Sequence, residues 1–112
     1  MEYTKNVKRQ IRELASLLYE RELNGELSKL DKDFEAWRKG ILSPFELSEK
    51  IHHFHQNEAR ELFNKFTTNS VLDMNVAWGI VQGKLKKEEV SAEVAEALAR
   101  QIAFYRSQLE AG

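Results

Sequence analysis

Apolar residues in the first forty positions of the chain follow the spacing of amphipathic helices. A first stripe, at four-three-four spacing, consists of Val7, Ile11, Leu14 and Leu18. A second, equally regular stripe consists of Leu23, Leu27, Leu30, Phe34, Trp37 and Ile41. The five-residue step from Leu18 to Leu23 breaks the phase, because at about 100° per residue it turns the second stripe roughly 140 to 150° away from the first.

The pair Asn24-Gly25 lies at this phase break. An Asn-Gly pair suits the left-handed cap at the C-terminus of a helix, so the sequence predicts two helices, over about 4–23 and 26–39. The alternative is one long helix that packs between partners, because an isolated glycine is tolerated inside a helix.

A third helix is predicted from Ser43-Pro44-Phe45-Glu46, directly after Gly40 closes the preceding helix. Serine is a good N-cap, proline suits the first helical position, and the glutamate three residues after the serine completes a capping box. An apolar stripe carries this helix over 44–67; it comprises Leu47, Ile51, Phe54, Leu62 and Phe66.

The sequence of residues 71–82 has features of both a β-strand and an α-helix. Their large apolar residues alternate as in a half-buried strand; these are Leu72, Met74, Val76, Trp78 and Ile80. A lone strand would leave its backbone groups unpaired, however, and Ser70 with Asp73 repeats the capping pattern while Gly83 follows as a stop. We therefore predict a short helix over 71–82 that other helices surround.

A last helix is predicted over 88–110 from a regular apolar stripe; it consists of Val90, Val94, Leu98, Ile102, Tyr105 and Leu109. Together the segments predict an all-α protein, a compact bundle of about five helices (4–23, 26–39, 44–67, 71–82 and 88–110) in a single domain over 1–112. Trp37 and Trp78 occupy apolar helix positions, so both are expected in the core.

Composition and charge narrow the classes of protein. The chain has 112 residues, and its 17 basic and 18 acidic side chains nearly cancel, which argues against nucleic acid as a partner. The absence of cysteine excludes disulfides and sulfur-ligated metal. No stretch approaches the roughly 18 apolar residues of a membrane span, and 1–11 lacks the apolar run of a signal peptide. We expect a soluble, cytoplasmic protein with no membrane contact.

The three histidines lie together in the third predicted helix, at His52, His53 and His55. A helical projection places His55 and Glu58 on the apolar face, His52 at its edge and His53 nearly opposite. A carboxylate on an apolar face is costly unless it is paired, and an imidazole three residues away is within reach. His52, His55 and Glu58 are therefore candidate ligands of a divalent transition metal, or His55 and Glu58 form a buried structural pair.

Four basic residues occupy the first turns of the first helix beside Tyr3; they are Lys5, Lys8, Arg9 and Arg12. They indicate either a phosphate-contacting patch or a solvated face, and the sequence favours the second because acids return soon afterwards.

The sequence contains no glycine-rich phosphate loop, HExxH zinc pair or nucleophile elbow, so it indicates no catalytic and no cofactor-binding residue. The chain has more apolar helix faces than one small core needs. We therefore predict an interaction or regulatory module that forms a homodimer, with a protein as its other partner class. The alternative is a metal-binding or hydrolytic bundle centred on His52, His55 and Glu58.

Overall fold

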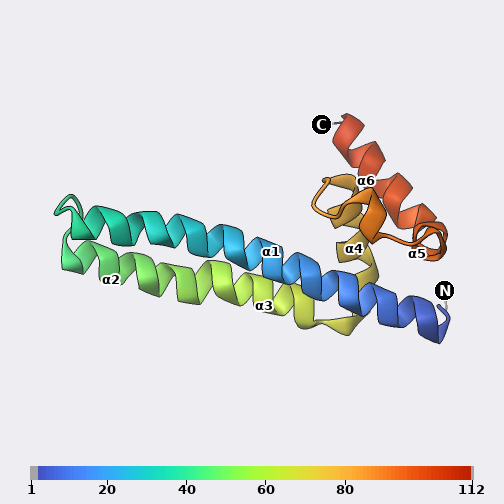
Figure 1. Cartoon of the computed structure of the whole chain (residues 1–112), viewed down its shortest axis with the longest axis horizontal. Helices are drawn as coiled ribbons and strands as arrows, with labels where there is room; N and C mark the ends of the chain where they lie inside the picture. The colour runs from blue at the N-terminus through green and yellow to red at the C-terminus, as the bar shows by residue number, and fades with distance from the viewer. Residues whose placement is uncertain (1–2, 112) are drawn as a thin grey trace. The chain divides into compact units, whose positions relative to one another are not determined.

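The computed structural model describes residues 3–111, and every regular element in that range is helical (Figure 1). The α-helices are α1 (Lys5–Arg38), α2 (Pro44–His53), α3 (Arg60–Thr67), α4 (Leu72–Val81), α5 (Ala92–Ala97) and α6 (Ala99–Ala111). A π-helical segment, η1 (Phe54–Ala59), joins α2 to α3, and the 3₁₀ turns are η2 (Asn69–Val71) and η3 (Lys87–Glu89). The predicted all-α class is confirmed, and within 3–111 no helix is long and apolar enough to cross a bilayer.

The chain divides into two compact units. The core unit comprises residues 1–18 and 65–112, and the hairpin unit comprises residues 19–64. Helix α1 contributes its first part to the core unit and the remainder to the hairpin unit.

Helix α1 runs without a break through Asn24 and Gly25, so the prediction of two helices over 4–23 and 26–39 is wrong and the continuous alternative is right. Gly25 does not take a positive φ; within 3–111 the glycines that do are Gly40 and Gly83. The phase break between Leu18 and Leu23 coincides with the boundary between the two units. The apolar stripe therefore shifts because the packing partner changes, and the helix itself continues.

The two predicted glycine stops are confirmed. Gly40 has φ 77°, its N–H donates to the Trp37 carbonyl at 3.0 Å, and the Ile41 N–H donates to the Ala36 carbonyl at 2.9 Å. This is the Schellman pattern, which satisfies carbonyls at the end of a helix and needs a residue that tolerates the left-handed region. Gly83, with φ 74°, ends α4 in the same way.

The predicted start of the third helix is also confirmed. The Glu46 N–H donates to Ser43 Oγ at 3.1 Å, and the Ser43 N–H donates to Glu46 Oε1 at 3.1 Å, so the capping box is complete. Pro44 is the first helical residue. The helical run then reaches Thr67 as predicted, but its middle six residues have π geometry.

The core unit holds nearly all the buried apolar side chains of the molecule. They are Val7, Ile11, Leu14, Ala15, Leu18, Phe66, Leu72, Val76, Ala77, Leu85, Val94, Leu98 and Ile102. Helix α4 is buried on several sides, which confirms the helix predicted over 71–82 in place of a strand. The buried amide of Asn75 donates to the Lys65 carbonyl at 2.8 Å, so this polar side chain is satisfied.

Helices α1 and α4 approach closely at Gly79. A Cβ placed on Gly79 would lie 2.6 Å from Cδ1 and 2.7 Å from Cδ2 of Leu18, and Leu18 is 0% exposed. Only glycine fits this position without displacement of a fully buried side chain.

Ser70 does not cap α4, contrary to the prediction. Val71 holds the cap position without a side-chain hydrogen bond, and Ser70 lies inside η2. An N-cap needs an extended backbone, and here the extended residue is Thr68 (φ −91°, ψ 102°), because the chain already turns in 3₁₀ geometry before α4 begins.

The single helix predicted over 88–110 is interrupted. Val90 is extended (φ −108°, ψ 119°), and Ser91 caps α5 by accepting a hydrogen bond from the Val94 N–H at 3.2 Å. Helical geometry is lost again at the fully buried Leu98 before α6 begins. The apolar spacing matched one helix, but the capping serine inside it determines where the helix starts.

Candidate functional site

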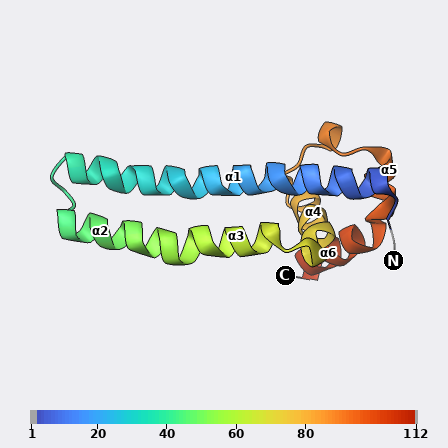
Figure 2. The ribbon, with the colours of Figure 1, turned by 90° about the horizontal axis from the view of Figure 1, so that it is seen from below.

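The hairpin unit consists of two antiparallel helical arms joined by a short turn (Figures 1 and 2). One arm is α1 from residue 19 onward, and the other is α2, η1 and the first part of α3. Leu47, at 6% exposure, is the one large apolar side chain of residues 19–64 that is buried. The second stripe predicted on α1 is therefore half-buried or exposed along its length.

Large apolar side chains are instead exposed on this unit. They are Leu27, Trp37, Ile41, Phe45, Ile51 and Phe63. Ile41 and Phe45 flank the turn and are 76% and 83% exposed. Trp37 is 42% exposed, so the prediction that it lies in the core is wrong. At this exposure, residues 19–64 do not enclose the Trp37 side chain.

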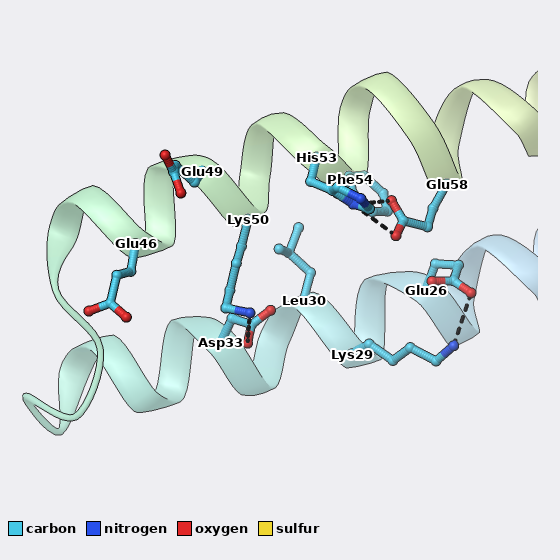
Figure 3. A pocket seen from close by; sticks show the side chains of 10 residues that line it. All are labelled: Glu26, Lys29, Leu30, Asp33, Glu46, Glu49, Lys50, His53, Phe54 and Glu58. Carbon is cyan, nitrogen blue, oxygen red and sulfur yellow. Dashed lines mark hydrogen bonds and ion pairs between the residues drawn. The ribbon is translucent and has the colours of Figure 1, made fainter.

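An open groove of about 630 Å³ lies between the two arms (Figure 3). Its lining is mainly charged: Glu26, Lys29 and Asp33 on one arm, and Glu46, Glu49, Lys50, His53 and Glu58 on the other, with the apolar Leu30 and Phe54. The ion pair of Lys50 and Asp33 bridges the arms, with Lys50 Nζ 3.9 Å from Asp33 Oδ1. Partly exposed pairs of this kind contribute about 0 to 1 kcal/mol, so charge alone does not hold the arms together.

Glu58 pairs with His53. His53 Nδ1 lies 3.1 Å from both carboxylate oxygens of Glu58 (Figure 3). The predicted inward-facing pair of His55 and Glu58 is therefore wrong. In the π-helical segment η1 the hydrogen bonds run from i to i+5, so residues five apart share a face, whereas the α-helical projection assumed three or four.

The other two predicted ligands are solvent-exposed. His52 lines one open hollow together with Ser48 and Asn57, and His55 lines a separate hollow with Tyr19 and Phe63. The described residues contain no group of three or more His, Asp and Glu side chains arranged to hold a metal ion. A metal role for His52, His55 and Glu58 stays a prediction, which metal analysis of the purified protein tests directly.

The core unit contains a polar network that the sequence does not predict. Tyr3 Oη donates to Asp73 Oδ2 at 2.8 Å, and Gln101 Nε2 donates to Tyr3 Oη at 2.8 Å. Burial raises the pKa of the Tyr3 phenol, and the hydrogen bond to the Asp73 carboxylate and its negative charge raise it further, against a smaller lowering by Gln101. Tyr3 is 70 positions from Asp73 and 98 positions from Gln101 in the sequence, so no local sequence pattern predicts these hydrogen bonds.

Comparison of the chain with protein-family models, curated proteins and solved structures finds no match. Its function therefore has to be argued from its own residues. The feature that distinguishes the hairpin unit is an apolar surface that its own residues leave uncovered.

Proposed function

We propose that this protein is a self-associating interaction module in which the hairpin unit packs against the hairpin unit of a second copy. The observation that carries the proposal is the contrast inside residues 19–64: one buried apolar side chain, Leu47, against six large apolar side chains that are substantially exposed.

Two antiparallel helices bury only one side of each. Helices obtain most of their stability from packing of an apolar face, and removing a Leu, Ile or Phe side chain from water contributes about 1.5 to 3 kcal/mol. Two such hairpins complete each other as a four-helix bundle, a common arrangement of short-looped helical pairs.

The second stripe on α1 supports a second copy as the occupant. Its spacing alternates four and three residues from Leu23 to Ile41, which is the heptad spacing of left-handed bundle seams. Residues 19–64 contain ten acidic and seven basic side chains, interspersed along both arms, so acids of one hairpin can meet bases of the other. Closed two-fold dimers are also the commonest assembly.

Sedimentation equilibrium with matched variants tests the proposal. Wild-type protein should have twice the 13.1 kDa mass of one chain at micromolar concentration. Leu27→Lys with Ile51→Lys places a charge on each arm at the proposed interface and should give a folded monomer. Ser28→Lys with Ser48→Lys changes neighbouring exposed positions in the same way and should leave the dimer intact.

Two results would count against the proposal. A wild-type protein that stays monomeric at several hundred micromolar would show that the hairpin surface is not self-complementary. A dimer that survives the Leu27 and Ile51 changes would place the interface elsewhere. Circular dichroism of each variant separates loss of association from loss of folding.

A further inference from the structure

The core unit contains a hollow of its own, separate from the groove and the exposed apolar side chains of the hairpin unit. It has a volume of about 440 Å³ and lies between the first turns of α1 and the start of α4. We propose that it binds a small amphipathic monoanion, a carboxylate with a short apolar chain. The volume lies in the range of small-molecule sites, which combine apolar walls with a few polar groups.

Two cations face this hollow from the same side of α1. Lys8 and Arg12 are one helical turn apart, and both line the hollow. Neither forms an ion pair with any residue in the described part of the chain, whereas Arg9 on the same helix lies 3.6 Å from Glu13. Charge-assisted hydrogen bonds from lysine and arginine are the usual means of holding a carboxylate.

The acidic residue of the lining, Asp73, already has hydrogen-bond partners within the protein. Asp73 accepts hydrogen bonds from the Tyr3 hydroxyl, the Gln101 amide and the Met74 backbone N–H. With Lys8, Arg12 and Asp73 the charged lining carries a net charge of +1, which one negative charge neutralises. A phosphate dianion would leave an excess of negative charge beside Asp73, so the lining favours a monoanion.

The remaining lining is suited to the rest of such a ligand. Ile11 and Leu72 are almost fully buried and form apolar wall, against which a short hydrocarbon chain can pack. The Ser70 hydroxyl lies at the exposed side and supplies one further donor. Cations, hydroxyl and apolar wall thus fit the two ends of one amphipathic molecule.

Hexanoate is the probe, and its binding is followed by amide chemical shifts of the full-length protein. We expect saturable shifts centred on Ile11, Ser70 and Leu72, with hexanol and inorganic phosphate binding at least about tenfold more weakly. Lys8→Gln with Arg12→Gln should weaken hexanoate by at least about tenfold. Lys86→Gln with Lys87→Gln removes the same charge away from the hollow and should leave affinity unchanged.

Four results would contradict parts of the proposed monoanion site. Absence of saturable hexanoate shifts removes the site, and equal binding of hexanol reduces it to an apolar hollow without anion recognition. Phosphate that binds as tightly as hexanoate overturns the monoanion selectivity. Equal losses in both double variants would show attraction by overall charge in place of contact with Lys8 and Arg12. The spectra of the variants without ligand report whether each is folded.

Discussion

Gly25 and Gly79 both lie inside α-helices, but their surroundings differ. A Cβ on Gly25 would meet no atom within 4 Å, while a Cβ on Gly79 would collide with Leu18. The same chemical change, glycine to alanine, therefore tests helix continuity at one position and close packing at the other. Single residues of this kind give the sharpest checks of the structure.

Gly79→Ala should destabilise the protein by about 1 to 3 kcal/mol, because the added methyl overpacks a site where the neighbouring side chain is fully buried. Chemical denaturation measures the loss. Gly79→Ala combined with Leu18→Ala should be less destabilising than the sum of the two single changes, since the smaller side chain makes room for the methyl. Strict additivity would show that the two residues are not in contact.

The pair of His53 and Glu58 is exposed enough for its contribution to be small. A double-mutant cycle of His53→Ala and Glu58→Gln should give a coupling free energy of about 0.2 to 1 kcal/mol. The matched cycle with His55→Ala should give coupling within experimental error. A larger coupling for His55 would restore the α-helical phase and contradict the π-helical segment.

Ionisation of Tyr3 should lower the free energy of unfolding at alkaline pH. Its pKa in the folded protein lies above the ordinary value of 10.0, so the folded state retains the phenolic proton more strongly than the unfolded state. The stabilisation is complete below about pH 10 and is lost as pH rises through the folded pKa. Tyr3→Phe should lower stability at pH 8 by about 1 kcal/mol through loss of the hydrogen bond to Asp73.

The same variant should flatten the decline in stability as pH rises above about 10, measured by urea denaturation. Tyr105→Phe, which removes a phenol elsewhere in the core unit, serves as the matched control. A Tyr3→Phe protein with the wild-type slope would show that the phenol is not held by Asp73 in solution.

At the scale of elements, three local signals correctly predicted where a helix begins or ends, whereas the cap signals at Asn24-Gly25 and Ser70 predicted ends that the structure does not have. The Ser43 capping box and the stops at Gly40 and Gly83 depend on local backbone geometry, and all three are present. Stripe spacing alone was less informative. It predicted a break in α1 where the partner changes, and it missed the interruption between α5 and α6.

The π-helical segment explains why the histidine site could not be predicted. The helical projection of Phe54–Ala59 assumes 3.6 residues per turn, and no residue in the segment marks a change of hydrogen bonding from i+4 to i+5. The partner of Glu58 is therefore His53, five residues before it, in place of His55, three residues before it. The Tyr3 network was equally invisible, because its members come from distant parts of the chain.

Gly25→Ala tests the continuity of α1 by the sign of its effect. In an exposed helix interior, alanine should stabilise the protein by about 0.5 to 1 kcal/mol. If the chain instead left the helix through a left-handed cap at Gly25, alanine would be destabilising. Gly40→Ala, at a true positive φ, is the control and should destabilise. Thermal or chemical denaturation distinguishes the two signs.

At the scale of the whole molecule, the two units differ in how their apolar residues are used. Among the described residues, the core unit buries thirteen apolar side chains and exposes Val71, Phe104 and Leu109, whereas the hairpin unit buries Leu47 and exposes six large apolar side chains. The expectation of self-association came from an excess of apolar helix faces, and the structure assigns the exposed part of that excess mainly to residues 19–64. Sequence periodicity identifies an apolar face, but which face stays uncovered depends on tertiary packing.

Hydrogen exchange measured as a function of protein concentration tests most directly whether a second copy completes the hairpin. Amides in 23–34 and 47–62 should become more protected as concentration rises through the dimerisation range, because association buries their apolar faces. Amides of α4 should keep the same protection throughout, as their core is enclosed within one chain. Hairpin amides that are as protected as those of α4 at the lowest concentration, with no dependence on concentration, would contradict the account.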